Sequence, residues 1–165
     1  MENTEKEQVL SEIISTQPLP DSEAFDTLWR SMIKIAGVMT GSSECNRQSM
    51  GTLFAKLSDE EIKRLLKDRS VDTLIFQDPP LETLLADPEE KPDGNSIMRI
   101  IGKLRSSRDS DFREALINLG EVIKRVHEKF RYVCTKEPGD GDSEILSSAR
   151  KILYLLAVLV VSKLN

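Results

Sequence analysis

Apolar residues recur at alternating steps of three and four along much of the chain, which is the spacing of an amphipathic helix. The strongest such stripe lies within residues 109–133 and consists of Phe112, Leu116, Leu119, Ile123, Val126, Phe130 and Val133. A second, broader stripe lies within residues 24–39 and includes Phe25, Leu28, Trp29, Met32 and Ile33. The pattern predicts two long helices, and it predicts that Trp29 is buried on the apolar side of the earlier one.

Shorter helical patterns and turn signals fill most of the remaining chain. We expect helices near residues 9–14, 50–57, 58–66 and 96–104, and turns at residues 17–20, 40–43 and 138–141. Val9, Ile13 and Ile14 would form the apolar face of the first of these helices. Residues 70–94 contain four prolines, so we expect one or two short helices there, joined by an irregular loop.

Residues suited to cap a helix stand before three of the predicted helices. They are Asp21 or Ser22, then Ser58, and finally Asp142 or Ser143. Ser58 and Glu61 also have the spacing of a capping box, in which each side chain bonds to the backbone amide of the other residue. The sequence therefore predicts where these helices begin.

The C-terminal segment, residues 152–161, is apolar on nearly every side. Its ten positions fall short of the roughly 20 residues that span a bilayer, so we expect a core helix with no membrane association. Such a helix must be buried all round, within the domain or in an oligomer interface. We predict an all-α, single-domain helical bundle over residues 21–165, preceded by a short helix and linker at 1–20, with the long helix packed on the C-terminal one.

Composition and charge suit a globular helical protein, with 39% hydrophobic, 31% charged and 5% aromatic residues and a net charge of −5. Residues 97–165 hold 13 basic and 9 acidic residues, a balance of +4, while residues 1–96 hold 10 and 19, a balance of −9. A basic half can present a local anion-binding face, although an acidic protein does not bind nucleic acid indiscriminately. Two distant cysteines and a polar, acidic start (MENTEKEQ) lead us to expect a cytoplasmic protein.

The sequence gives no local signature of a metal or cofactor site. It contains one histidine and no paired cysteines, so neighbouring residues cannot form a zinc site, and no glycine-rich phosphate loop is present. The acidic run at 140–144 fails as a calcium loop, because Ile145 stands where glycine is needed and Lys151 where a bidentate glutamate is needed. We expect neither a metal nor a cofactor.

The polar side of the long helix is the best candidate for chemistry. At helical spacing Lys124, His127, Glu128 and Arg131 share one face, and Arg125, Lys129 and Tyr132 share an adjoining one. This surface could bind a phosphate, an RNA or a protein partner, and His127 could transfer a proton near neutral pH. The alternative is a solvated face crossed by contacts such as Glu121 with Arg125 and Glu128 with Tyr132.

Several of these segments together resemble the HEPN superfamily. They are residues 25–29 (FDTLW), residues 119–127 (LGEVIKRVH), a glycine-containing turn and a final helix at 143–164, so the resemblance covers residues 22–164. The resemblance implies a dimeric helical bundle with a role in toxin–antitoxin or antiviral systems. Active members are metal-independent ribonucleases with an R-x-x-x-x-H motif on the late helix.

The chain departs from this motif at both of its defining positions. His127 occupies the position of the arginine and Tyr132 that of the histidine. A tyrosine cannot replace imidazole as a general base at neutral pH, because its ordinary pKa is about 10. The resemblance therefore implies a degenerate, noncatalytic binding or scaffolding module that forms a homodimer or binds a protein partner through the late and C-terminal helices. The alternative is a metal-independent ribonuclease with an atypical site centred on His127.

Overall fold

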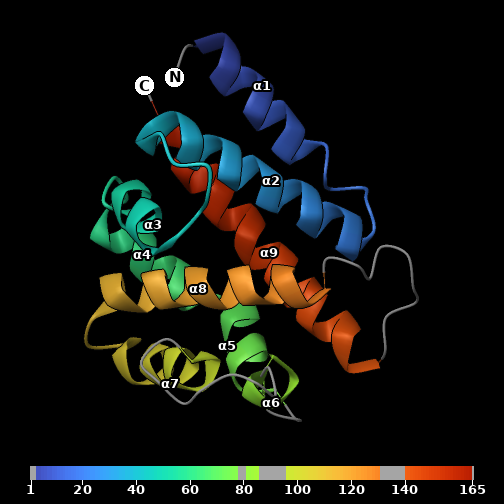
Figure 1. Ribbon diagram of the computed structural model, residues 1–165, viewed down its shortest axis with the longest axis vertical. Helices are drawn as coiled ribbons and strands as arrows, with labels where there is room; N and C mark the ends of the chain where they lie inside the picture. The colour runs from blue at the N-terminus through green and yellow to red at the C-terminus, as the bar shows by residue number, and fades with distance from the viewer. Residues whose placement is uncertain (1–2, 78–80, 86–95, 131–139, 165) are drawn as a thin grey trace.

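The structure is a computed structural model. It describes residues 3–77, 81–85, 96–130 and 140–164, and for residues 82, 83 and 140–142 it describes the backbone alone. These residues form helices and connecting turns, with no strand among them, which confirms the all-α prediction (Figure 1). The helices are α1 (Asn3–Ile14), α2 (Asp21–Thr40), α3 (Arg47–Phe54), α4 (Asp59–Leu66), α5 (Arg69–Ile75), α6 (Leu81–Leu85), α7 (Ile97–Ser107), α8 (Phe112–Phe130) and α9 (Asp140–Ser162).

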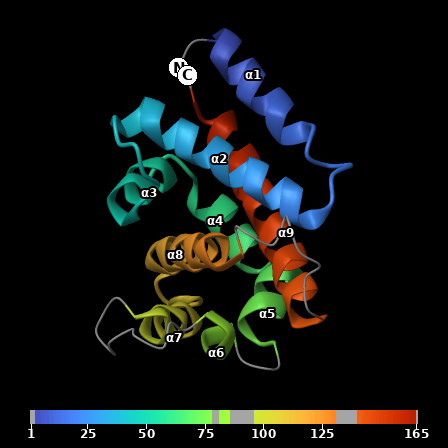
Figure 2. The same cartoon turned by 45° about the vertical axis from the view of Figure 1, so that its right-hand side comes forward.

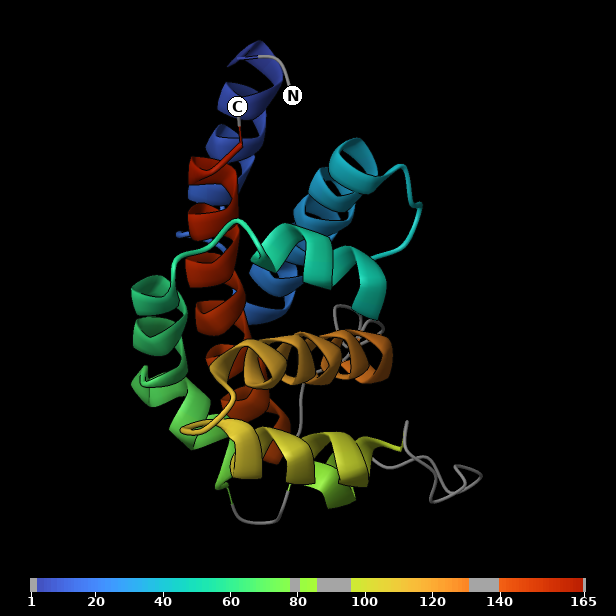
Figure 3. The ribbon, with the colours of Figure 1, turned by 90° about the vertical axis from the view of Figure 1, so that its left-hand side faces the viewer.

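The C-terminal helix α9 forms the centre of the bundle. It packs most extensively against α2, and α5 and α1 cover further parts of it (Figures 1 and 2). The long amphipathic helix α8 does contact α9, but it packs mainly against α7, with α3 and α4 as further neighbours (Figure 3). The predicted pairing of α8 with α9 is therefore only one of several contacts and does not organise the fold.

Local hydrogen bonds explain where several helices begin and end. The Ser58 hydroxyl accepts a hydrogen bond from the Glu61 amide at 3.2 Å, and the Glu61 carboxylate accepts one from the Ser58 amide at 2.9 Å. This confirms the predicted capping box at the start of α4. Helix α2 ends at Gly41, whose φ of 73° lies in the left-handed region that favours glycine.

Three predicted helix details differ from the structure. Neither Asp21 nor Ser22 caps α2, because its N-cap position is Pro20 and carries no side-chain hydrogen bond. Helix α9 begins at Asp140, two residues before the earlier of its two predicted caps. Ile14 is 48% exposed, so the apolar face of α1 is formed by Val9 and Ile13 without it.

Arg150 on α9 joins the α1–α2 linker to the centre of the bundle. Its guanidinium donates hydrogen bonds to the backbone carbonyls of Leu19 at 2.7 Å and of Thr16 and Gln17 at 2.8 Å. It also bonds to the Asp21 carboxylate at 2.9 Å. Arg150 therefore binds the Asp21 carboxylate, which the sequence suggested as a helix cap. It also provides hydrogen bonds to linker carbonyls that lie outside any helix.

Apolar side chains from α1 to α9 form one shared core, to which Trp29 belongs with an exposure of only 5%. The segment Ser143–Ser162 is long and apolar enough to cross a membrane, but 56% of its most apolar stretch is buried inside the bundle. The sequence led us to expect burial of this helix on every side, and within the bundle that prediction is wrong. One side of α9, the α9 outer stripe, stays exposed or half-buried and comprises Ser147, Lys151, Leu155, Val158 and Ser162.

Candidate functional site at the junction of α2 and α8

The single histidine of the chain joins α8 to α2. The Nε2 atom of His127 lies 2.9 Å from Oδ1 of Asp26, and the other oxygen of that carboxylate lies 2.9 Å from Nη2 of Arg30. Asp26 and Arg30 are one turn apart on α2, so they form an i,i+4 ion pair on the side of the helix that meets α8. The three side chains form a chain of charge-assisted contacts between two helices.

Two aromatic residues of α2 enclose the imidazole. The ring of Trp29 stacks on it with 5.6 Å between ring centroids and 26° between ring planes, and Phe25 lies tilted at 5.9 Å. The His127 side chain is therefore only 17% exposed. Arg30 differs strongly, because 77% of its side chain is open to solvent. A ligand approaching this junction would meet Arg30 before it met the imidazole.

The other candidate residues of α8 do not gather around His127 in one cluster. Lys124 is half-buried and lies near the Cys45 thiol, where its charge acts on the thiol pKa. The exposed Glu128 lies 3.8 Å from Nε of Arg125, while Lys129 is exposed at the end of the helix. Arg131 and Tyr132 lie outside the described residues, so the predicted His127–Tyr132 pair remains a prediction.

Cys45 is a buried thiol beside this surface, with an exposure of 3%. Burial raises its pKa to about 11, because the thiolate is poorly solvated there. The positive charge of Lys124 and a hydrogen bond with Ser49 oppose this rise in the pKa, and the negative charge of Glu121 reinforces it. A thiol in this state is a poor nucleophile at neutral pH, so Cys45 is a core residue rather than a catalytic one.

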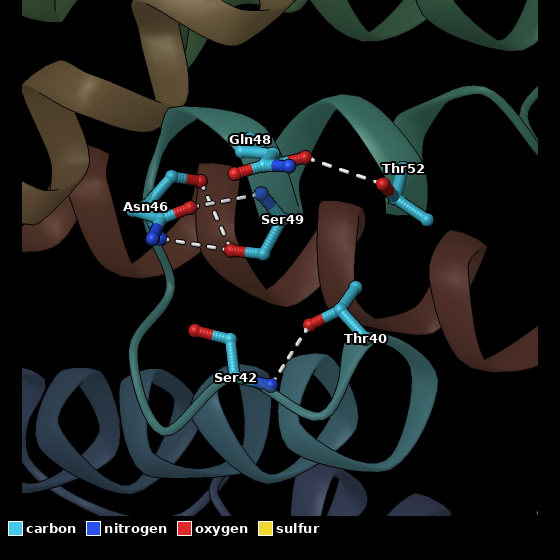
Figure 4. Close-up of a pocket in the computed structure, with 6 residues that line it drawn as sticks. All are labelled: Thr40, Ser42, Asn46, Gln48, Ser49 and Thr52. Atoms are coloured by element: carbon cyan, nitrogen blue, oxygen red, sulfur yellow. Dashed lines mark hydrogen bonds between the residues drawn. The ribbon is translucent and has the colours of Figure 1, made fainter.

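A polar hollow of about 280 Å³ lies between the end of α2 and α3, close to Cys45 in sequence (Figure 4). Its lining carries hydroxyl and amide groups but no charged side chain. Most of these groups already bond to one another: the Ser49 amide donates to the Asn46 side chain at 2.9 Å, and the Thr40 hydroxyl accepts from the Ser42 amide at 3.3 Å. These bonds shape the α2–α3 connection and leave no reactive pair in the hollow.

Sequence reasoning missed Asp26 and Arg30 as partners of His127. A signal was present, because Asp26 and Arg30 are one helical turn apart, on either side of Trp29 in the sequence, on a helix that is otherwise largely apolar. Two opposite charges placed one turn apart beside a core tryptophan indicate that something polar packs there. The partner could not be identified, because Asp26 and His127 are separated by 101 positions.

The arrangement allows one kind of chemistry. A carboxylate bonded to one imidazole nitrogen orients the ring and leaves Nδ1 as the nitrogen that could exchange a proton. Among the described residues no group of three or more His, Cys, Asp or Glu side chains is placed to hold a metal ion. The chain matches no protein-family model, no curated protein and no solved structure, so the HEPN resemblance rests on the residues of the chain itself.

Proposed function

We propose that this chain is a noncatalytic, HEPN-like helical binding module of the cytoplasm, which acts through protein association and provides a surface for RNA. A role in a defence or toxin–antitoxin system follows from the same resemblance. The enclosure of His127 is the observation that supports the noncatalytic assignment. Its ring is packed between Phe25 and Trp29, and its Nε2 atom is taken up by Asp26.

The energetics of this contact favour a structural role for the histidine. The His127 side chain is 17% exposed and bonded to a carboxylate, so it stabilises the packing of α8 on α2 whether or not a substrate binds. General acid–base catalysis on RNA also needs cations around the scissile phosphate. Arg30, the cation that shares the Asp26 carboxylate with His127, is already paired with it at 2.9 Å. The junction thus has a stabilising function that needs no substrate.

The α9 outer stripe supports the association part of the proposal. Leu155 and Val158 lie on this stripe and remain half-buried, although the opposite side of the same helix is in the core. Covering apolar surface of this kind is the main driving force of protein association. We propose a homodimer in which a second copy covers Leu155 and Val158, in place of the broader α8–α9 surface expected from the sequence.

The Asp26–His127 pair supports the second candidate function, a metal-independent ribonuclease. In that case Asp26 would orient the imidazole, and Nδ1 of His127 would move the proton. The deciding experiment is cleavage of a mixed-sequence RNA by the purified protein in EDTA. We expect none. Cleavage that disappears in both His127→Ala and Asp26→Asn, with both variants folded by circular dichroism, would establish the ribonuclease and overturn the noncatalytic assignment.

Light scattering tests the association, with Val158→Asp as the key variant. Val158 is half-buried, so the charged residue should dissociate the dimer while the fold persists. Val38→Asp is the matched control, because Val38 is 48% exposed on α2 and away from the stripe. Arg125→Glu tests the α8 surface and should leave the dimer intact. A wild-type protein that stays monomeric at every accessible concentration contradicts the homodimer.

A further inference from the structure

A second polar hollow, of about 320 Å³, lies between α5 and the first turns of α9. These helices pack side by side, away from the junction of α2 with α8 (Figures 1 and 3). Helix α5 contributes Arg69 and Ser70 to its lining, and α9 contributes Ser147, Ser148 and Lys151. The hollow thus combines two cations with several hydroxyl groups contributed by two helices.

Two of these hydroxyls are distinguished by lacking a partner. Ser70 and Ser148 are each only 7% exposed, and neither hydroxyl forms a hydrogen bond within the described part of the chain. The other buried serines and threonines of that part, namely Thr16, Ser31, Ser49 and Ser96, all bond through their hydroxyls. Neither hydroxyl oxygen is among the buried polar atoms that lack a partner, so both hydroxyls open into the hollow, where they are free to donate to a ligand.

The cations of the hollow are also available to a ligand. Arg69 is exposed and forms no ion pair with any described residue. Lys151 is 59% exposed, and its Nζ atom lies 3.8 Å from Oδ1 of Asp68, which is a loose contact. That same Asp68 oxygen already accepts a hydrogen bond from the Ser70 amide at 2.9 Å. Neither cation is therefore committed to a tight internal partner.

We propose that this hollow binds a small phosphomonoester, whose phosphate lies between Arg69 and Lys151 and accepts hydrogen bonds from the hydroxyls of Ser70 and Ser148. Two cations and two hydroxyl donors match the charge and the three terminal oxygens of a phosphate better than the two oxygens of a carboxylate. Glu144, the acidic residue of the lining, provides an acceptor for a hydroxyl group on the organic part of the ligand.

A neighbouring hollow of about 310 Å³ provides room for that organic part. It shares Ser147 and Lys151 with the first hollow, so the two adjoin along the α9 outer stripe. The Tyr154 hydroxyl lines it and accepts a hydrogen bond from Gln17 at 2.9 Å. Arg150 also lines it, but its guanidinium is occupied by the linker between α1 and α2. The phosphate is therefore assigned to the first hollow, where Arg69 and Lys151 have no tight internal partner.

The test is a titration of the full chain with glycerol 3-phosphate and with inorganic phosphate, at constant ionic strength set by sodium chloride. Amide NMR shifts report binding, and the thermal midpoint reports stabilisation by the bound ligand. We expect saturable shifts at residues 69, 70, 147, 148 and 151, with tighter binding of glycerol 3-phosphate. Arg69→Gln and Lys151→Gln should each weaken this binding about tenfold, since each removes one charged hydrogen bond.

Serine variants separate a ligand site from a structural role. Ser70→Ala and Ser148→Ala remove hydroxyls that have no internal partner, so stability without ligand should be unchanged or higher. Their affinity for glycerol 3-phosphate should nevertheless fall several-fold. Lys103→Gln on α7 is the matched control, because it removes the same charge from an exposed site elsewhere and should bind as the wild type does.

Three outcomes would overturn the proposal. They are shifts that sodium chloride alone reproduces, equal weakening of binding by Lys103→Gln and Lys151→Gln, and serine variants with unchanged affinity. Equal affinity for inorganic phosphate and glycerol 3-phosphate would overturn the assignment to a phosphomonoester. The site shares no residue with the α2–α8 junction. Ser147 and Lys151 also belong to the α9 outer stripe, but the dimer is tested at Val158, which lies outside the site, so the two proposals are judged by separate experiments.

Discussion

The imidazole of His127 on α8 and the carboxylate of Asp26 on α2 lie 2.9 Å apart, with side-chain exposures of 17% and 23%. This largely buried contact connects two helices whose apolar faces pack mainly against other helices. Helix α8 packs mainly on α7, and α2 packs mainly on α9. The pair therefore bridges two parts of the bundle, and its strength can be measured as a coupling between two substitutions.

We predict that His127→Ala lowers the free energy of unfolding by about 2 kcal/mol, because it removes both the carboxylate contact and the packing on Trp29. Asp26→Ala should cost about 1 kcal/mol. The double variant should be more stable than the sum of the two losses implies, with a coupling of about 1 kcal/mol. Urea denaturation of the four proteins measures it, and strict additivity would mean that the contact contributes nothing.

The fold and the junction were predictable to different degrees, for a physical reason. Periodicity along one helix reports which side is buried, so the stripes of α2 and α8 and the buried Trp29 were all predictable. The Ser58–Glu61 capping box was predictable because its bonds span three residues. Contacts between distant residues have no such local signature. The bonds of Arg150 to the α1–α2 linker and of Asp26 to His127 depend on how helices cross.

Glu61 provides a prediction about pH. The bond from the Ser58 amide lowers the pKa of its carboxyl group, and the bond from Lys163, which directly follows α9, lowers it further. A depressed folded-state pKa stabilises the fold above the pKa of the unfolded chain, and this contribution disappears as pH falls through the folded-state value. Glu61→Gln should thus be less stable than wild type near neutral pH, by at most about 1 kcal/mol.

The measurement is urea denaturation of wild type and Glu61→Gln from about pH 7 down to about pH 3. The two stabilities should converge on the acidic side. Glu60→Gln is the control, because Glu60 is an exposed carboxylate on the same first turn of α4. Convergence of the same size in Glu60→Gln would show that a general charge effect, and not the capping box, is responsible.

Cys45 should be nearly unreactive in the native protein. With its pKa raised to about 11 from an ordinary 9.0, the thiolate population at pH 8 falls about a hundredfold. Burial of the side chain slows attack further, since only 3% of it is exposed. A Cys134→Ser variant isolates the thiol for reaction with a disulfide reagent. Lys124→Gln should slow the reaction again, because Lys124 lowers the thiol pKa. Equal rates in native and urea-unfolded protein would contradict the buried assignment.

Gly120 on α8 faces α3. A Cβ atom added there would lie 2.6 Å from Sδ of Met50 and 3.5 Å from a ring carbon of Phe54, so the buried Met50 side chain would have to move. Alanine within a helix normally gains about 1 kcal/mol over glycine. At Gly120 this gain should be cancelled by the displacement of Met50, whereas Gly102→Ala, with nothing within 4 Å of its added Cβ, should show it in full.

A double variant tests whether the Met50 side chain is what opposes alanine at position 120. Met50→Ala alone should lower the free energy of unfolding by about 2–4 kcal/mol, because it leaves a cavity between α3 and α8. In the Gly120→Ala background the same substitution should cost about 1 kcal/mol less, since the new methyl group fills part of that cavity and its clash is gone. Thermal and urea denaturation of the four proteins give these values. If Met50→Ala costs the same in both backgrounds, α3 and α8 do not approach as closely as the contact of Gly120 with Met50 requires.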